Sequence, residues 1–253
     1  MNYFERRNEL RQKAVAHTAK MNELYANEIK DSFEKSVIYG VNAKKPELSI
    51  ADRTPTTKLI QTDVVSSVLD LPTDKKICVL NFASYTHPGG MFIDGSSAQE
   101  ESICHESNLY NIISQFEDSF YTWNLDNKNK ALYKDRAIYT PNVVVERGNE
   151  KRVVDVLTCA APNYGAAKKY QMVSQTENYV ALRQRAIFVK QILEEQGVEI
   201  AVLGAWGTGV FKQDVTEVAE LWRYLFSSST IDQIIHPIID GRTFDKFDEV
   251  YKR

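Results

Sequence analysis

Short apolar runs alternate with helix-periodic segments along most of the chain. The clearest apolar runs are Ile77–Ala83, Val153–Ala161, Glu199–Gly204 and Ile234–Ile239, and each has the length of a buried strand. Apolar residues three or four positions apart predict helices near 3–33, 63–69, 173–196 and 214–226. Strands that are apolar on both faces and alternate with helices predict an α/β fold. Its sheet is expected to be mixed and largely parallel, with helices on both faces.

The remaining segments are less regular, and their predictions are coarser. They are a short strand at Ser36–Gly40, a loop at Asn42–Pro55, a strand at Lys58–Thr62, a loop or broken helix at Tyr121–Lys134, one interrupted strand or two strands at Ala137–Val145, and a final turn or helix from Arg242. Proline cannot donate to a sheet ladder, so Pro141 predicts an edge or a break in its strand. The helix that starts near Gln99 is expected to run into Phe116–Phe120. We divide the chain into an N-terminal helical extension, 1–35, and one α/β domain, 36–253.

A glycine-rich loop follows the apolar run at Ile77–Ala83. It contains His87-Pro88-Gly89-Gly90 and Gly95-Ser96-Ser97, and Gln99-Glu100-Glu101 starts the next helical period. Glycines allow a close approach of backbone to a ligand and leave amides free to bind it. One interpretation makes Ser96 or Ser97 an N-cap and the glutamates partners of the helix dipole. The other has the loop wrap a phosphate or sugar on which the carboxylates act, and the glycines favour it.

A second glycine loop, Gly204-Ala205-Trp206-Gly207-Thr208-Gly209, also follows a strand and precedes a helix. It lacks the lysine of a P-loop and the spacing of a dinucleotide fingerprint. Its amides and the following helix can bind a diphosphate. In an open α/β sheet both loops converge at the carboxyl ends of their strands. Amides for a diphosphate and carboxylates for a sugar together indicate a nucleoside diphosphate sugar such as ADP-ribose.

The stretch GGMFIDGSSAQEE resembles the GGG-X(6–8)-QEE signature of the bacterial and fungal poly(ADP-ribose) glycohydrolases, which are built on a macrodomain. Asn81 and its neighbours, the strand ending in Ala161-Pro162-Asn163, and LGAWGTGVF are similar to the same family. One position departs from the signature: Met91 stands where the family has its third glycine, so the loop is expected to differ in shape there.

The resemblance implies a macrodomain-like fold, hydrolysis of the O-glycosidic bonds of poly(ADP-ribose), and a role for each matching residue. Glu101 would be the general acid that protonates the leaving oxygen and later deprotonates water, which requires a raised pKa. Glu100 would bind ribose hydroxyls and Gln99 would orient the loop. The implied ADP-ribose-binding residues are Asp63, Asn81, Gly89, Gly90, Gly207, Thr208, Gly209, Val210 and Phe211. No cofactor or metal is implied.

Several of these residues also have an ordinary structural explanation. Asp63 is favoured as a helix N-cap over an adenine ligand. Phe211 can be a core aromatic under its loop, and Asn163 is more simply a turn residue. Two consecutive glutamates on a helix are expected to point in different directions, which favours one bifunctional glutamate over an opposed acid–nucleophile pair.

Composition limits the classes of partner that are expected. The formal net charge of −3 supplies no global basic field, so the sequence predicts no general nucleic-acid-binding surface. The expected partners are ADP-ribose and ADP-ribosylated macromolecules. Three widely spaced cysteines, no apolar signal region and no run long enough to span a bilayer predict a cytoplasmic protein with no membrane partner.

Three alternatives stay open at this point. The first is a hydrolase that removes single ADP-ribose groups from a protein or nucleobase, with Met91 reshaping the pocket. The second is a non-catalytic ADP-ribose-binding module, which need not keep Gln99-Glu100-Glu101, so their presence favours an enzyme. The third is a domain that acts on another nucleotide-linked sugar.

Overall fold

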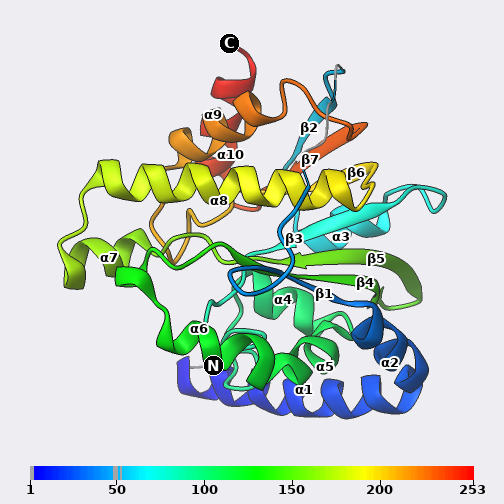
Figure 1. Cartoon of the computed structure of the whole chain (residues 1–253). Coiled ribbons are helices and arrows are strands. Elements are labelled where there is room, and N and C mark those ends of the chain that lie inside the picture. Colours follow the sequence, from blue (N-terminus) through cyan, green and yellow to red (C-terminus); the bar gives the residue numbers. More distant parts are fainter. Residues whose placement is uncertain (1–2, 48–50, 52) are drawn as a thin grey trace.

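A seven-stranded mixed sheet forms the centre of the structure, a computed structural model that describes residues 3–47, 51 and 53–253 (Figure 1). In spatial order the strands are β1 (Val37–Gly40), β4 (Arg136–Arg147), β5 (Glu150–Thr158), β3 (Ile77–Asn81), β6 (Ile200–Val202), β7 (Gln233–Pro237) and β2 (Thr56–Ile60). The neighbours from β5 to β2 pair in parallel, whereas β4 is antiparallel to both β1 and β5. The predicted mixed, largely parallel sheet is therefore confirmed.

Helices cover both faces of this sheet. The first face carries α1 (Tyr3–Leu24), α2 (Ala26–Lys35), α3 (Val64–Leu69), α4 (Gln99–His105) and α5 (Leu109–Ile113), and the second carries α8 (Gln175–Glu195), α9 (Val215–Leu225) and α10 (Gly241–Tyr251). Two further helices, α6 (Thr122–Asp126) and α7 (Tyr164–Gln171), lie at the end of the molecule seen on the left of Figure 1. Non-α turns occupy Ser114–Phe116, Glu117–Tyr121 and Asn129–Ala131. No helix among the described residues is long and apolar enough to span a membrane.

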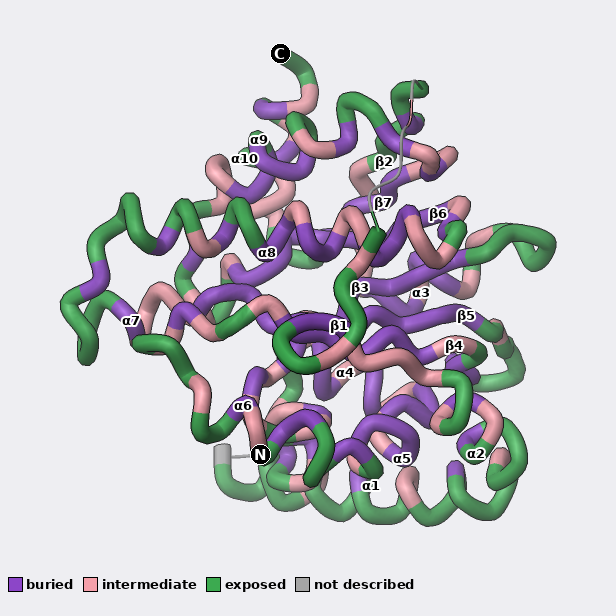
Figure 2. Tube along the Cα trace, in the orientation of Figure 1, coloured by how far each residue is buried: buried purple, intermediate pink, exposed green. Residues whose placement is uncertain are grey.

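Side chains of each central strand alternate between two cores. Along β3, Ile77 and Val79 pack under α1–α5, whereas Cys78 and Leu80 pack under α8–α10. This is the period of two expected for a strand. Figure 2 shows the result, with buried strands in the middle and exposed outer turns on the helices.

The N-terminal helices α1 and α2 are packed against the sheet face that carries α1–α5. Ala14 and Met21 of α1 are fully buried, and the His17 side chain lies 2.8 Å from the carbonyl of Ser107. The predicted extension, 1–35, contains these two helices and also residues 1–2, which lie outside the described residues. The predicted loop at 42–55 likewise includes 48–50 and 52, which lie outside them.

One local prediction is wrong, one helix was missed, and one predicted break in a strand takes a definite form. The helix from Gln99 ends at His105 because Ser107 bridges to Val145 of β4 and the Asn108 side chain accepts from the Val144 amide. Helix α7 was not predicted, since its apolar content is low. The break at Pro141 takes the form of a bulge within one strand, where Asn142 adopts φ 58° and the register shifts.

Candidate active site

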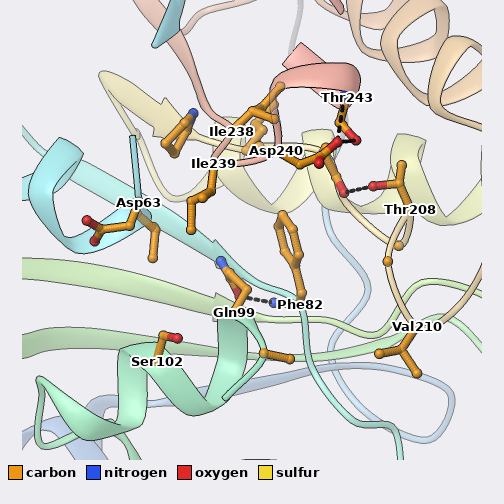
Figure 3. A pocket seen from close by; sticks show the side chains of 18 of the residues that line it. Asp63, Phe82, Gln99, Ser102, Thr208, Val210, Ile238, Ile239, Asp240 and Thr243 are labelled. Atoms are coloured by element: carbon orange, nitrogen blue, oxygen red, sulfur yellow. Dashed lines mark hydrogen bonds between the residues drawn. The ribbon is translucent and has the colours of Figure 1, made fainter. Parts of the chain in front are cut away.

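A cavity of about 590 Å³ opens at the carboxyl ends of the parallel strands. Its walls come from the residues that follow β2, β3, β6 and β7, together with the start of α4. In Figure 3, Phe82 and Ile239 point into the same space, with Asp63 at one side of the view and Val210 at the other. The predicted convergence of the strand ends on one ligand site therefore agrees with the observed position of the cavity.

The second glycine loop forms one wall of this cavity. Gly204 and Gly207 have φ of 59° and 77°, and added Cβ atoms would lie within 3 Å of Phe82 and Ala161 respectively, so the fold itself requires these glycines. Gly209 has neither a positive φ nor any atom within 4 Å of an added Cβ. A side chain at Gly209 would therefore begin in open space, beside the cavity that this residue lines.

Several amides of this loop have no protein acceptor. Within the described chain, the amides of Gly207, Gly209, Val210 and Phe211 donate no hydrogen bond. All four residues line the cavity, as does Thr208, whose hydroxyl donates to the carbonyl of Ala205 at 2.8 Å. Clustered free amides are the donors that a diphosphate needs.

Phe211 serves both the loop and the core. Its ring is half-buried and lies edge-on to Tyr133 with 6.1 Å between centroids, and Tyr133 in turn stacks on Tyr85 at 4.2 Å. Phe211 also lines the cavity. One edge of its ring can therefore meet a ligand while the other is held by aromatic neighbours.

Glu100 is 3% exposed and is held by donors from β3 and the loop after it. Asn81 Nδ2 donates to Oε1 at 3.1 Å, and the Ser84 amide donates to Oε2 at 2.6 Å. Asn81 is itself fully buried at the end of β3. Burial raises the pKa of Glu100 to about 8 despite these donors, and the charge of Glu101 acts in the same direction.

Glu101 is 6% exposed, and its two oxygens differ. Oε1 accepts from the Met91 amide at 2.9 Å, whereas Oε2 is buried with no partner in the described part of the chain. A Cβ added to Gly90, which has φ of 61°, would lie 2.6 Å from Oε1 of Glu101 and 3.0 Å from Oε2 of Glu100. Both carboxylates therefore border Gly90, and the expectation that consecutive glutamates point apart is wrong here.

The first glycine loop differs from the prediction of free amides. Ser84 and Met91 donate to the two carboxylates, and Gly90 donates to the carbonyl of His87. The proposed cap at Ser96 or Ser97 is also wrong, because Ala98 occupies the N-cap of α4 and no side chain caps that helix. Buried carboxylates need donors, so this loop folds around the glutamates and not around an open anion site. Gly89, with φ of 68°, packs against the ring of Tyr110.

Gln99 connects the carboxylates to the cavity. Its Oε1 accepts from the Phe82 amide at 2.8 Å and its Nε2 donates to the Leu80 carbonyl at 3.0 Å, which ties the start of α4 to the end of β3. Gln99 lines the cavity, whereas Glu100 and Glu101 lie in the layer next to it. The structure thus brings the predicted residues into two adjoining sets. The cavity set is Asp63, Gln99, Gly207, Thr208, Gly209, Val210 and Phe211, and the carboxylate set is Asn81, Gly89, Gly90, Glu100 and Glu101.

Asp63 is the N-cap of α3, as favoured from the sequence. Its Oδ1 accepts from the amides of Val65 and Ser66 at 2.9 and 3.0 Å, and both of its oxygens contact the Arg147 guanidinium. Burial acts to raise the pKa of Asp63, but Arg147 and Ser66 hold it well below its usual range. Asp63 lines the cavity with both oxygens already engaged, so its role toward adenine stays a prediction. Asn163 likewise caps α7 by accepting from the Ala166 amide.

Sequence reasoning missed two parts of the cavity. Phe82 follows β3 and stands at its centre, and Ile238–Asp240 follow β7 and close one side. Both positions follow strands that the sequence predicted. The rule that ligands bind at the carboxyl ends of strands could therefore have identified them. No group of three or more metal-ligating side chains occurs among the described residues.

Comparison with known proteins places these features in context. The family profile described as "Microbial-type PARG, catalytic domain" matches residues 3–148, where PARG denotes poly(ADP-ribose) glycohydrolase. The structure is similar to the poly(ADP-ribose) glycohydrolase of Thermomonospora curvata, with a TM-score of 0.86, 25% identity, and coverage of 96% of this chain and 100% of that one. The same enzyme bound to the inhibitor ADP-HPD matches with a TM-score of 0.83 and 25% identity, over 96% of this chain and 99% of that one.

The poly(ADP-ribose) glycohydrolase of Deinococcus radiodurans in complex with ADP-ribose is also similar. It matches with a TM-score of 0.78 and 25% identity, over 88% of this chain and 97% of that one. A search of curated protein sequences found no significant match. The structural matches confirm the predicted macrodomain-like fold.

Proposed function

Because this chain belongs to the microbial-type poly(ADP-ribose) glycohydrolase family, we propose that it hydrolyses the ribose–ribose O-glycosidic bonds of poly(ADP-ribose) and releases ADP-ribose. The observation that carries this conclusion is the pair Glu100 and Glu101, buried against Gly90 beside a cavity with free amides. Two buried carboxylates are costly for folding alone, and they lie where the sugar of a bound nucleotide would end.

The cavity supports binding of one ADP-ribose unit. The free amides of Gly209, Val210 and Phe211 would bind the diphosphate, and Phe82 and Ile239 offer apolar surface to the adenine. The distal ribose would then extend past Gln99 toward the carboxylates. The Deinococcus radiodurans relative has a structure with ADP-ribose bound, which supports this assignment.

Glu101 would act as the general acid and base. Its Oε1 is fixed by the Met91 amide, while Oε2 is unpartnered and can present a proton to the leaving ribose oxygen. The glycosidic C–O bond breaks as that proton is transferred, and an oxocarbenium-like state forms at the anomeric carbon. Glu101 then takes a proton from the attacking water, which restores the acid and leaves ADP-ribose with a free anomeric hydroxyl.

Glu100 would position the ribose and help the pair to retain a proton. The raised pKa of Glu100 means that the pair carries a proton near neutral pH, and in coupled sites the proton belongs to the pair. Asn81 and the Ser84 amide hold Glu100 in place, so its carboxyl can accept from a ribose hydroxyl without moving.

The test is direct. The protein is incubated with poly(ADP-ribose), and with protein or nucleobase substrates that carry single ADP-ribose groups, and released ADP-ribose is measured. Release from the polymer supports the proposal, whereas release only from the single groups makes the chain a mono-ADP-ribose hydrolase. Binding of ADP-ribose without any release makes it a non-catalytic module. ADP-ribosylated macromolecules are the proposed partners, and the cysteine pattern supports a cytoplasmic location.

A further inference from the structure

A second cavity of about 560 Å³ lies beside the loop that holds the carboxylates. Thr86 of that loop forms one side, and Tyr133 faces it from the segment after α6. Lys128 and Lys130 line it as well, and α7 closes the remaining side. None of its lining residues belongs to the main cavity, so it is a separate site.

The backbone on one wall of this cavity is strained. Asn129, Lys130, Ala131 and Tyr133 have φ between 47° and 64°, a region that residues with a side chain rarely adopt. Backbone strain of this kind clusters at ligand clamps. The Asn129 side chain donates to the Tyr133 carbonyl at 2.9 Å, and the Asn163 amide donates to the Ala131 carbonyl at 2.9 Å. Contacts from both ends therefore hold the wall in this shape.

The strained wall contacts the segment that contains the second glycine loop and Phe211. Tyr133 contacts Phe211 through its ring, and the Gly165 amide donates to the Phe211 carbonyl at 3.0 Å. The side chain of Lys212 packs over Gly165. Three segments, 127–134, 163–172 and 204–213, thus meet at Phe211, where the main cavity ends.

These three segments carry six lysines and no acidic residue. We call them the lysine rim: Lys128, Lys130, Lys134, Lys168, Lys169 and Lys212. All six are exposed, and within the described chain none lies within 4 Å of a carboxylate. Two acidic residues are nearby. Asp126 lines the cavity, and the charge of Lys130 lowers the pKa of Glu177 slightly, after the larger effect of its hydrogen bonds with Ser174. Most other lysines in the structure pair with an acid. An unneutralised basic surface on a chain of net charge −3 indicates a polyanionic ligand.

We propose that the lysine rim and its cavity bind the diphosphate of a second ADP-ribose unit, adjoining the one in the main cavity. This inference rests on the proposed function, since it makes the rim a subsite for the polymer. Each further unit of the polymer brings a diphosphate, which lysines bind as point charges. Free ADP-ribose fills only the main cavity, so the rim strengthens binding of the polymer and leaves binding of the monomer unchanged.

The test compares two triple variants of equal charge in full-length protein. Lys128→Gln/Lys130→Gln/Lys134→Gln removes part of the rim, and Lys45→Gln/Lys58→Gln/Lys246→Gln removes three exposed lysines that also have no ion pair in the described chain. Affinities for labelled poly(ADP-ribose) and for ADP-ribose are measured across a salt series, with Glu101→Gln added to prevent turnover. The rim variant is expected to lose about tenfold or more in polymer affinity and to show a shallower salt dependence. Its affinity for ADP-ribose is expected to stay within about twofold of that of the protein without lysine substitutions. The control triple is expected to stay within about twofold of that protein in its affinity for both ligands.

Three results would overturn the proposal. The first is unchanged polymer affinity in the rim variant, and the second is an equal loss in the control triple. The third is equally tight, rim-dependent binding of single-stranded DNA of the same length, which would make the rim a general polyanion surface. Because these are binding measurements, they separate failure of the rim from failure of the proposed hydrolysis, which turnover of the unmodified protein tests on its own.

Discussion

The backbone amide of Met91 donates a 2.9 Å hydrogen bond to Oε1 of Glu101. Met91 stands where the resembling family has its third glycine, yet it is absent from the described residues with positive φ. Met91 is 44% exposed and lines a separate cavity with Arg6 and Arg7 of α1. Position 91 therefore serves the carboxylate through its main chain, which any residue except proline can supply.

Met91→Ala is accordingly expected to leave ADP-ribose affinity and polymer turnover within about twofold of the original protein, because the amide donor remains. Calorimetry and a turnover assay check this. A loss of tenfold or more in either would show that the Met91 side chain shapes the substrate site.

Gly90→Ala is expected to damage the site. The new methyl would sit 2.6 Å from Glu101 Oε1, so the carboxylates or the loop must move. Gly148→Ala is the matched control, since Gly148 has the same φ of 61° but no atom within 4 Å of an added Cβ. Both variants should lose about 1–2 kcal/mol of stability from backbone strain. Turnover should fall at least tenfold more in Gly90→Ala, and equal turnover in the two would contradict crowding of the carboxylates at Gly90.

Gly209→Val is expected to weaken ADP-ribose binding at least tenfold with little change in melting temperature. An added Cβ meets no protein atom within 4 Å, but a valine side chain would occupy space that the diphosphate needs. Isothermal calorimetry and thermal unfolding check the two parts separately. If the variant binds ADP-ribose normally, this loop is only a turn between β6 and α9.

Glu100→Gln is expected to change how stability depends on pH. The pKa of Glu100 is raised by burial to about 8, against an ordinary value of about 4.3. The folded state therefore keeps a proton that the unfolded chain releases. The stability from this group is fully present below about pH 4.3 and is lost as the pH rises to about 8. Glutamine has no such proton, so the original protein should lose stability relative to the variant across this window, by up to about 1.4 kcal/mol per pH unit. A difference in melting temperature that is constant between pH 5 and 8 would contradict the raised pKa.

The sequence predicted the sheet and the position of the site because both rest on long-range regularities. Continuous apolar runs such as Ile77–Ala83 require burial on both faces, and glycine loops after strands converge at one edge. It did not predict where the amides of Ser84 and Met91 point, since that depends on the burial of Glu100 and Glu101. Short-range cues also failed at Ser96 and Ser97, where two good capping residues precede a helix that begins after Ala98.

The break after His105 was equally hidden from local reasoning. Helical periodicity continues through Leu109 and Ile112, but Asn108 exchanges hydrogen bonds with Val144 of β4, which is 36 residues away in the sequence. Asp63 shows the opposite case, because its N-cap contacts are local and the sequence was sufficient to favour them. Its partner Arg147 is distant in sequence and could not be identified from the pattern.

The measurement that tests the central claim most directly is turnover of poly(ADP-ribose) by Glu101→Gln beside its affinity for ADP-ribose. Glutamine keeps the shape of Glu101 and can still accept from the Met91 amide, but it cannot donate and recover a proton at the unpartnered oxygen. A positioned acid–base group contributes about 10²–10⁴-fold, so turnover should fall by at least the upper end of that range while ADP-ribose affinity is retained. Wild-type turnover in the variant would contradict the assignment of Glu101 as the acid and base.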